Sequence, residues 1–310
     1  MRVFLTGAAG FVGSNLLRQL LDAGDCEVAA LVLPQFDLWR IAELLPRVRL
    51  VEGDLEAPAA LEKTIADFAP DTVIHLAWKG VINNDRNDPS QTDNIAPSLA
   101  LVKMAQRIGV KNWLGLGSQA EYGPQPRAVD ETTPTAPTTL YGAAKLRVCV
   151  AAQRLCEIYG LRFGWLRLFS SYGPGDHPNW MIPYLIEKLL NGERPSLTAG
   201  GQLWDYIYVA DAAEAIAAVA RTPGASGVFN LGSGRAESLR KIVENIRDRI
   251  DPRLPLGFGE IPYRPDQVMR LEADISRLRA ATGWAPRTPL STGLARTIEW
   301  HNERRRKSHA

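Results

Sequence analysis

The stretch "RVFLTGAAGFVGSNLL", residues 2–17, joins a short apolar run to a glycine-rich turn and then to a segment with leucines at helical spacing. The run predicts a buried strand and the segment predicts a helix. Between them lie Gly7, Gly10 and Gly13. The first glycine permits a tight turn, the second lets backbone amides approach a pyrophosphate, and the third lets the helix pack on the strand. The stretch therefore predicts a dinucleotide-binding turn, with the helix N-terminus facing the phosphates.

The alternation of strand and helix continues to about residue 169. Apolar runs typical of strands occur at 2–6, 27–33, 48–52, 72–77, 113–118 and 162–169, and helical patterns occur at 11–23, 37–45, 58–68, 94–108 and 138–159. Such alternation favours a parallel sheet covered by helices on both faces. Right-handed crossovers make it a doubly wound, Rossmann-type α/β fold.

The pattern changes after residue 170, where proline and glycine clusters indicate that loops dominate. Two elements still resemble a sheet with a cover helix: "DYIYV" (205–209), which leads into an alanine-rich helix at 210–221, and "GVFNLGS" (227–233). We therefore expect residues 1–169 to form a dinucleotide-binding domain, with returning elements near 205–232. Residues 170–310 are expected to form mainly a smaller substrate-binding domain.

Composition limits the kind of partner. The 310 residues carry a formal charge of only +2, which gives no electrostatic case for a nucleic-acid or membrane surface. No uninterrupted apolar stretch is long enough to span a bilayer. Cys26, Cys149 and Cys156 have no metal-ligand or redox spacing, so we expect buried thiols, no metal and a cytoplasmic location. The charged tail at 303–310 is expected to be a solvated, frayed terminus.

Two further positions bear on a dinucleotide. Asp54 in "VEGDLE" follows the third predicted strand, where its carboxylate either accepts a hydrogen bond from an adenine amino group or serves a turn. The tip of the second strand, "LVLPQ", offers neither the acid that binds a ribose 2′-hydroxyl of NAD nor the arginine that pairs with the 2′-phosphate of NADP. Asp37 and Arg40 lie slightly further along, so the choice between NAD and NADP stays open.

A reacting centre is predicted where three polar residues converge. Ser118 ends the strand at 113–118, at the carboxyl edge that also carries the glycine turn. In "LYGAAKLRV", residues 140–148, Tyr141 and Lys145 are four apart and share one face of a helix. An ammonium one turn from a phenol favours the phenolate, which makes the tyrosine a better base near neutral pH.

At this point the chain resembles an extended short-chain dehydrogenase/reductase of the NAD-dependent epimerase/dehydratase group, whose members mostly act on nucleotide sugars. The matching pieces are "GAAGFVG", "EGDL", "VIHLAW", "GSQAEYG", "YGAAK", "RLFSSYGPGDHP", "WDYIYVAD" and "FNLGSG", in family order. The resemblance implies that Tyr141 is the general acid/base and that Ser118 hydrogen-bonds the reacting oxygen. It also implies that Lys145 binds the nicotinamide ribose and lowers the pKa of Tyr141.

The resemblance also assigns binding residues. The backbone of Phe11 and Val12 would contact the pyrophosphate, Asp54 and Leu55 the adenine, and Leu76, Ala77 and Trp78 the cofactor ribose. Lys79 either touches the sugar or has no role. Candidate substrate residues are Ser118, Ser170, Asn179, Trp180 and Arg264, although Trp180 and Trp204 are equally compatible with a core position and Arg264 with an ion pair to Asp266.

The reaction is narrowed by the residues after Ser118. Dehydratases of this group carry an acid pair there, whereas this chain has Gln119 and Ala120, and Glu121 is one position late. Reduction of a nucleotide 4-keto-6-deoxyhexose at C4 and 4-epimerisation through a transient 4-keto sugar remain, and we favour the reductase. Other readings are a small-ketone or flavonoid reductase and a non-catalytic dinucleotide-binding regulator or scaffold. The resemblance further implies a homodimer formed through the helices at 94–108 and 138–159.

Overall fold

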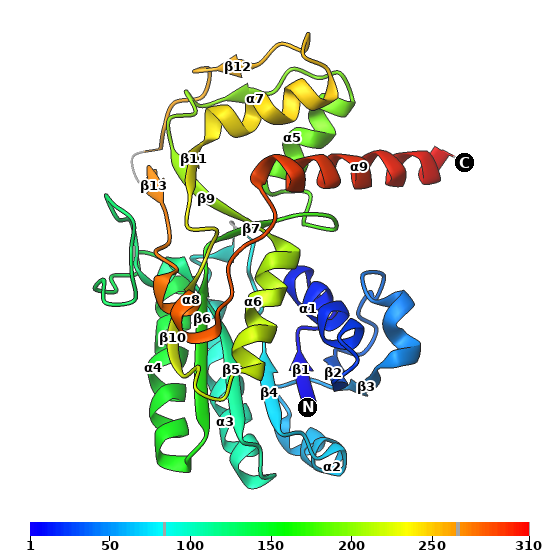
Figure 1. Ribbon diagram of the computed structural model, residues 1–310, viewed down its shortest axis with the longest axis vertical. Helices are drawn as coiled ribbons and strands as arrows, with labels where there is room; N and C mark the ends of the chain where they lie inside the picture. The colour runs from blue at the N-terminus through cyan, green and yellow to red at the C-terminus, as the bar shows by residue number, and fades with distance from the viewer. Residues whose placement is uncertain (83–84, 265–266, 310) are drawn as a thin grey trace.

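The computed structural model describes residues 1–82, 85–264 and 267–309. Its main element is a seven-stranded sheet with strand order β10-β6-β5-β4-β1-β2-β3 (Figure 1). All neighbouring strands of this sheet run parallel. The strands are β1 (Arg2–Thr6), β2 (Glu27–Val32), β3 (Arg49–Glu52), β4 (Thr72–His75), β5 (Asn112–Ser118), β6 (Arg162–Leu168) and β10 (Gly227–Leu231). The predicted doubly wound parallel sheet is confirmed, and its strand order reverses between β1 and β4, where such folds bind ligands.

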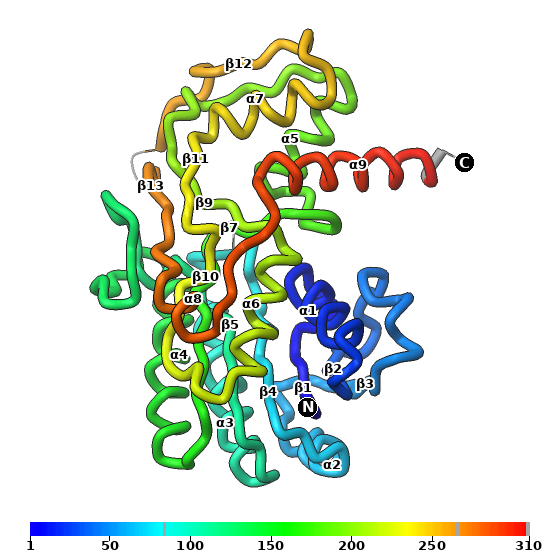
Figure 2. The backbone as a smooth tube through the Cα atoms, viewed as in Figure 1, coloured from blue at the N-terminus to red at the C-terminus, as the bar shows by residue number. Residues whose placement is uncertain are grey.

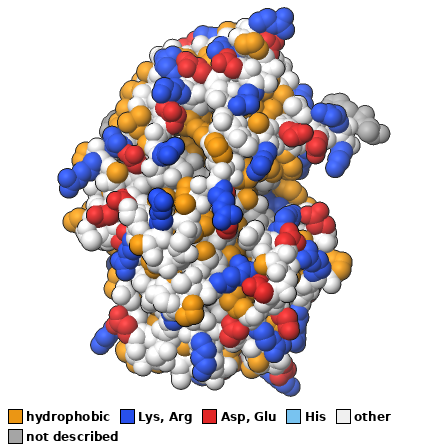
Figure 3. All heavy atoms as spheres, in the orientation of Figure 1, with side chains coloured by type: hydrophobic (Ala, Val, Ile, Leu, Met, Phe, Trp, Pro, Cys, Tyr) orange, Lys and Arg blue, Asp and Glu red, His pale blue; other side chains and the backbone are white. Residues whose placement is uncertain are grey.

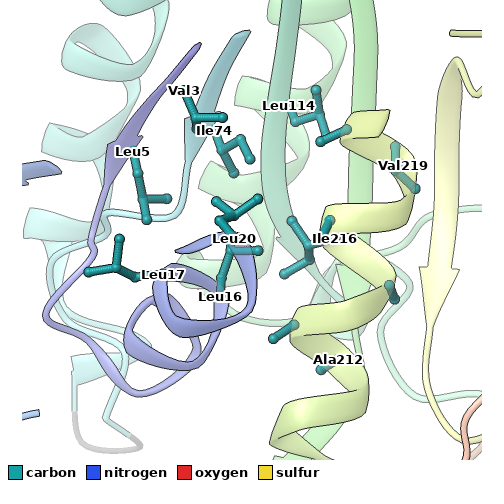
Figure 4. Packing of buried hydrophobic residues seen from close by; sticks show 14 of the residues in the cluster. Val3, Leu5, Leu16, Leu17, Leu20, Ile74, Leu114, Ala212, Ile216 and Val219 are labelled. Carbon is teal, nitrogen blue, oxygen red and sulfur yellow. The ribbon is translucent and has the colours of Figure 1, made fainter. Parts of the chain in front are cut away.

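Helices cover both faces of this sheet. One face carries α1 (Phe11–Asp22), α6 (Val209–Arg221) and α8 (Ser276–Thr282), and the other carries α2 (Pro58–Phe68), α3 (Ile95–Arg107) and α4 (Leu140–Tyr159). Figure 4 shows Leu16, Leu17 and Leu20 of α1 packed between the sheet and Ile216 of α6. These three leucines are fully buried, and each contributes about 2 kcal/mol of hydrophobic stabilisation.

Helix α4 carries the tyrosine and lysine singled out by their spacing. The Thr139 side chain accepts a hydrogen bond from the Gly142 amide and caps the helix at its start. Gly160, with a φ of 66°, ends the helix in the left-handed conformation that glycine adopts without strain. Cys149 and Cys156 are buried on the face of α4 that packs on the sheet, whereas Cys26 is only half-buried. The predicted boundaries of this helix differ from the observed ones by only a residue or two.

Residues 37–45 do not form the predicted α-helix. The structure has turns there and then the 3₁₀ helix η1 (Ala42–Arg47), which contains Pro46. Proline lacks an amide N–H and disfavours the helical conformation of the residue before it, so an α-helix cannot continue through this segment.

The turn before η1 contacts the far end of the chain. The Trp39 ring stacks on Trp300, with ring centroids 6.2 Å apart, and the Arg304 guanidinium lies 5.0 Å from the Trp39 centroid. The Arg40 guanidinium carbon lies 4.4 Å from the centroid of the Trp39 ring. Its Nε donates a hydrogen bond to the Gly175 carbonyl at 3.0 Å. We call these five residues the terminal clasp. It ties the loop after β2 to the C-terminal helix and to the loop after β7.

The region after residue 170 is more regular than predicted, so the expectation of mostly loops was wrong. Its elements are β7 (Ser170–Tyr172), α5 (Met181–Leu190), β8 (Ser196–Leu197), β9 (Leu203–Tyr208), β11 (Ala236–Ser238), α7 (Leu239–Ile250), β12 (Gly257–Phe258), β13 (Arg270–Leu271) and α9 (Leu290–His309). Strands β7, β11 and β13 all pair with β9, and β8 pairs with β12. Helices α5, α7 and α9 surround a separate core with β7 and β9. The tail expected to fray is the last part of α9.

Only part of the segment near 205–232 returns to the large sheet. Strand β10 pairs with β6 at its edge, and α6 packs against α1. Strand β9 belongs instead to the four-stranded sheet. The division of the chain at residue 169 into dinucleotide-binding and substrate-binding domains stays a proposal.

The path of the chain after residue 170 explains why the carboxyl ends of the strands in the large sheet face the elements of the second region. Figure 2 shows the chain rising after β7, returning through β9 to α6, rising again after β10 and returning through β13 to α8 before α9. On the face drawn in Figure 3, acidic and basic side chains are interspersed. Among the described residues, none of the helices combines the length and apolar character needed to cross a membrane.

Candidate active site

The glycine turn after β1 has the close packing that its spacing predicts. Gly7 has a φ of 74°, and a Cβ there would lie 2.7 Å from the Ala77 amide nitrogen. A Cβ on Gly13 would lie 1.9 Å from the Gly7 carbonyl oxygen. Both positions therefore require glycine, because a side chain would separate α1 from β1 and from the end of β4.

The N-terminus of α1 is open where a dinucleotide phosphate would bind. Gly10 is the residue before the helix, and no described side chain caps the helix there. Among the described atoms, a Cβ on Gly10 would meet only the Gly7 carbonyl oxygen within 4 Å, at 3.2 Å, so the rest of its surroundings is free of protein atoms. The amides of Phe11 and Val12 lie in the first turn, where backbone N–H groups have no partner within the helix. This end of α1 fits a pyrophosphate.

The predicted adenine side is bounded by Asp54, Leu55 and Lys79. Asp54 accepts a hydrogen bond from the Glu56 amide, and Leu55 packs against the core on the α2, α3 and α4 face. The Lys79 ammonium pairs with Glu56 and lies 3.7 Å from an Asp54 carboxylate oxygen. Lys79 is therefore engaged on this side of the crevice, and within the described part of the chain its ion pairs are with Asp54 and Glu56 and not with the other substrate candidates.

The loop after β2 gives no clear choice between the two dinucleotides. Asp37 accepts a hydrogen bond from the Trp39 amide within the turn. Arg40 belongs to the terminal clasp, and its burial lowers the pKa of the guanidinium while the Asp176 carboxylate raises it. Both residues therefore have local partners in the structure.

Three predicted residues form one cluster at the carboxyl ends of β1, β4 and β5. The Lys145 ammonium lies 3.7 Å from the centroid of the Trp78 ring and 5.9 Å from that of Tyr141. Trp78 and Tyr141 meet edge to face, with centroids 6.0 Å apart. Lys145 also donates to the Leu116 carbonyl at 2.7 Å. Leu76 and Ala77, directly before Trp78, are held against β1 by hydrogen bonds from their amides to Thr6.

Ser118 lies at the end of β5 beside this cluster. Its hydroxyl oxygen accepts a hydrogen bond from the Ala120 amide at 3.1 Å, and its own amide donates to Glu121 at 2.9 Å. Glu121 is fully buried and pairs with the buried Arg167 at 2.8 Å. Glu121, which is one position too late in the sequence to belong to a dehydratase acid pair, therefore points into the interior. There it accepts a hydrogen bond from the Ser118 amide and holds the backbone of that residue.

The protonation states of Tyr141 and Lys145 are set mainly by burial. Burial raises the pKa of the Tyr141 phenol, while the charge of Arg86 and a hydrogen bond with Ser118 act to lower it and Glu121 acts to raise it. Burial lowers the pKa of Lys145 to about 7, against the charge of Glu121. The sequence predicts that Lys145 lowers the Tyr141 pKa. In the structure the net shift is upward, and the cation that opposes it is Arg86.

The remaining substrate candidates lie on the elements that face this edge. Ser170 begins β7, and Trp180 precedes α5 with its ring 5.7 Å from the Arg86 guanidinium. Asn179 is exposed, and its amide donates to the His177 ring. Arg264 is exposed between β12 and β13, and its carbonyl accepts from the Gln267 amide at 3.0 Å. The alternative partner of Arg264, Asp266, lies outside the described residues.

Sequence reasoning missed two features of the site. Arg86 lies with its guanidinium 5.0 Å from the Tyr141 ring centroid, and it follows the end of β4 by eleven residues, so no local spacing connects it with the site. The pair of Glu121 and Arg167 also went unnoticed, although Arg167 lies opposite Gly117 in the β5–β6 register. A glycine opposite a buried arginine leaves room for a carboxylate, and a Cβ at Gly117 would lie 2.5 Å from Glu121.

Known proteins resemble the chain over most of its length. Residues 3–232 match the model of the NAD dependent epimerase/dehydratase family. A UDP-glucose 4-epimerase of Azospirillum brasilense is 30% identical over 323 residues, covering 96% of this chain and 91% of that protein. A dTDP-glucose 4,6-dehydratase of Mycolicibacterium smegmatis is 28% identical over 312 residues, covering 97% of this chain and 93% of that protein.

A solved structure shows the same arrangement. The UDP-glucose 4-epimerase of Thermus thermophilus, crystallised with NAD, superposes with a TM-score of 0.85 at 27% identity, covering 97% of this chain and 99% of that one. The glycine turn, the cluster at the strand ends and these matches lead to one conclusion. The chain belongs to the NAD dependent epimerase/dehydratase family, within the extended short-chain dehydrogenases/reductases.

Proposed function

We propose that the chain is an NAD(P)-dependent enzyme that reduces the 4-keto group of a nucleotide-diphosphate 4-keto-6-deoxyhexose. We base this on the grouping of Tyr141, Lys145 and Ser118 beside the glycine turn, because these are the groups that a proton-coupled hydride transfer needs. The bound nicotinamide supplies the hydride. Membership of an NAD-dependent family favours NAD as the cofactor.

In this proposal the cofactor is held along the carboxyl edge of the sheet. The Phe11 and Val12 amides bind the pyrophosphate, with Gly7, Gly10 and Gly13 providing the space. Asp54 and Leu55 border the adenine. Leu76, Ala77 and Trp78 line the ribose, and the Lys145 ammonium hydrogen-bonds the hydroxyls of the nicotinamide ribose.

Tyr141 acts as the general acid. As hydride reaches C4 of the sugar, the phenol gives its proton to the carbonyl oxygen, which becomes a hydroxyl, and the resulting phenolate regains a proton from solvent. Ser118 donates a hydrogen bond to the same oxygen and stabilises the charge that develops on it. The substrate diphosphate and sugar are assigned to Arg264, Ser170, Asn179 and Trp180.

The residues after Ser118 argue against dehydration, and the protonated state of Tyr141 favours reduction over epimerisation. Elimination of water needs a further acid and base, whereas the residues after Ser118 are Gln119 and Ala120, and Glu121 is committed to Arg167. Burial raises the Tyr141 pKa, so the phenol keeps its proton near neutral pH. That is the state in which a reductase begins, while an epimerase begins by removing a proton from a sugar hydroxyl.

A 4-epimerase is the second candidate, because a relative that covers 96% of the chain carries that name. The same tyrosine would then alternate between base and acid. The two reactions differ in their use of cofactor: a reductase consumes one NAD(P)H per sugar, and an epimerase converts its sugar with no net consumption.

The test is to incubate the purified chain with nucleotide 4-keto-6-deoxyhexoses or with nucleotide hexoses while following the absorbance of reduced nicotinamide. Stoichiometric consumption with the keto sugar supports the reductase. Conversion of a hexose without consumption assigns the epimerase instead. An absence of either reaction with UDP-, dTDP-, CDP- and GDP-linked sugars contradicts both.

Tyr141→Phe is expected to reduce turnover by about 10²- to 10⁴-fold, because it removes the proton donor but keeps the ring. Cofactor affinity, measured by quenching of tryptophan fluorescence, is expected to stay within a few-fold of wild type. Tyr159→Phe, at the other end of α4, is the matched control and should leave turnover unchanged. Turnover by Tyr141→Phe close to wild type would remove the tyrosine from the mechanism.

A further inference from the structure

Tyr141 has two cations near its ring, and they differ in how firmly they hold their charge. Lys145 is turned toward other partners: its ammonium donates to the Leu116 carbonyl at 2.7 Å and lies closer to the Trp78 ring than to the Tyr141 ring. Burial also lowers the pKa of Lys145 to about 7. Among these three contacts, the nearest partners of the Lys145 ammonium are thus Leu116 and Trp78, not the Tyr141 ring.

Arg86 is the second cation. Its guanidinium carbon lies 5.0 Å from the Tyr141 centroid, against 5.9 Å for the Lys145 nitrogen. A guanidinium stays protonated at every pH at which a protein is folded. Its charge at Tyr141 is therefore permanent.

The backbone holds Arg86 in this position. The Tyr141 amide donates to the Arg86 carbonyl at 2.9 Å, and the Leu140 amide donates to the Asn87 side chain at 3.2 Å. The start of α4 and the segment that carries Arg86 are thereby joined at two points. The backbone of Arg86 therefore cannot move away from the start of α4 without breaking these bonds.

The Arg86 guanidinium also lies near a second aromatic ring, and one of its nitrogen atoms is buried. The centroid of the Trp180 ring also lies 5.7 Å from the guanidinium carbon of Arg86. Its Nε atom is buried and has no hydrogen-bond partner among the described residues. A half-buried cation beside two rings is less screened by water than a fully exposed one, and it therefore acts more strongly on a neighbouring ionisable group.

We propose that Arg86 is a positioning residue that acts together with Lys145 in setting the ionisation of Tyr141. Through the Tyr141 ring it favours the phenolate that forms after the proton is delivered. The inference rests on the proposed function for its catalytic meaning, but the interaction of the two side chains does not depend on any substrate.

The charged and titratable groups around Tyr141 come from three elements. Arg86 lies on the segment before η3 (Pro89–Asn94), Lys145 on α4 and Glu121 on η4 (Gln119–Glu121), where the glutamate is paired with Arg167. Arg86 and Glu121 act on the phenol in opposite directions. Removing Arg86 is therefore expected to leave the unfavourable influence of Glu121 and of burial, and to raise the pKa of Tyr141.

The experiment titrates position 141 directly. A fluorinated tyrosine, whose phenol ionises at lower pH than tyrosine, is placed at residue 141, and its phenolate absorbance is followed against pH in the whole chain without substrate. Arg86→Gln is expected to raise the midpoint by about one pH unit or more. Arg86→Lys should restore part of the shift, and Arg147→Gln, which removes an exposed charge from the same helix, should leave the midpoint unchanged.

An unchanged midpoint in Arg86→Gln overturns the proposal, as does an equal shift in Arg147→Gln. Circular dichroism checks that each variant is folded, and if Arg86→Gln is not, Arg86→Met, which keeps a flexible stem over the ring, carries the same test. If the midpoint moves but no nucleotide sugar is turned over, the role of Arg86 stands and the proposed function fails. If a sugar is turned over and the midpoint does not move, the reverse holds.

Discussion

Among single residues, Lys145 lies in an environment that favours its charged form in two ways and its neutral form in another. The aromatic face and the Leu116 carbonyl both stabilise a charged Lys145. Burial favours the neutral amine, and the balance leaves the pKa of Lys145 at about 7. An anion that binds beside Lys145 would favour its charged form.

His75, at the end of β4, predicts how the fold responds to acid. Its ring bonds to Thr6 and Ser98, and burial together with the Lys145 charge lowers its pKa from 6.5 to about 3. Between those values the unfolded chain binds a proton that the folded chain does not, so the free energy of unfolding falls as pH decreases below about 6.5. At pH 5 the loss from this residue is about 2 kcal/mol.

Urea unfolding at pH 7.5 and at pH 5 measures this loss. His75→Gln keeps a polar side chain for Thr6 and Ser98 but cannot titrate, so its stability should decrease with acid by about 2 kcal/mol less than that of wild type. His177→Gln, outside the core, is the control and should follow wild type. Equal acid sensitivity in wild type and His75→Gln would contradict the assignment.

The residues of the reacting centre could be predicted where chemistry and local spacing coincide. Tyr141 and Lys145 are four apart on one helix, and Ser118 ends a strand, so their positions follow from secondary structure alone. Arg86 could not be placed in this way, because it reaches Tyr141 through contacts between a loop and a helix 53 residues further along, as the bond between Leu140 and Asn87 shows. The direction of the Tyr141 pKa shift could not be predicted either, because it depends mainly on burial, and the spacing of residues in the sequence does not show how deeply a side chain is buried.

At the level of elements, two glycines at the junction of β1 and α1 have different expected roles: Gly13 allows the helix to pack on the strand, and Gly10 leaves room for the cofactor. Gly13→Ala would place a Cβ 1.9 Å from the Gly7 carbonyl oxygen, so α1 must shift and the core beneath it must loosen. We expect a loss of about 1–3 kcal/mol in unfolding free energy, together with weaker cofactor binding.

Gly10→Ala is the matched comparison for this junction. Gly10 has a φ of −73°, which alanine adopts readily, and its added Cβ meets only the Gly7 oxygen at 3.2 Å. It should therefore change thermal stability little while weakening NAD binding by tenfold or more (about 1.4 kcal/mol), because the methyl group occupies the phosphate site. Thermal unfolding and NAD titration of the two variants check the pair, and identical behaviour would refute the distinction.

Elements with regular periodicity were predictable, and those stabilised by distant contacts were not. The strands and helices up to residue 169 are correct apart from 37–45, where Pro46 and the terminal clasp decide the backbone. Helix α7 was overlooked although Leu239, Ile242, Val243 and Ile246 repeat at helical spacing and are buried on α5 and α9. Its high charge concealed the pattern. Strand β9 has the sequence of a sheet strand, but sequence alone does not state which sheet it joins.

For the whole molecule, the outer face of α4 supports the proposed homodimer. Val150 and Ile158 are 62% and 63% exposed and lie eight residues apart, on one side of the helix. Helix α3 packs beside α4, so the two present a common outer surface. A two-fold arrangement of this surface would bury both side chains.

Sedimentation equilibrium is expected to give twice the mass of the 34.1 kDa chain. Val150→Glu combined with Ile158→Glu should shift the equilibrium to the monomer, because it places carboxylates in an apolar contact. Tyr184→Glu alters a hydrophobic residue of α5 that is also exposed, and it should leave the mass unchanged. A monomeric mass for wild type at micromolar concentration would contradict the proposed dimer.

The terminal clasp constrains the order in which the molecule can be completed during synthesis. The ribosome releases Trp39 early, together with the strands that follow it, but Trp300 and Arg304 are translated about 260 residues later than Trp39. Until then Trp39 in the loop after β2 has no stacking partner from α9. The conformation of this loop then depends on the hydrogen bond from Arg40 to the Gly175 carbonyl. A nascent chain stalled before α9 would therefore carry all seven strands of the large sheet with an unsecured loop after β2. Helix α9, translated after every strand of that sheet, is the element that holds this loop in place.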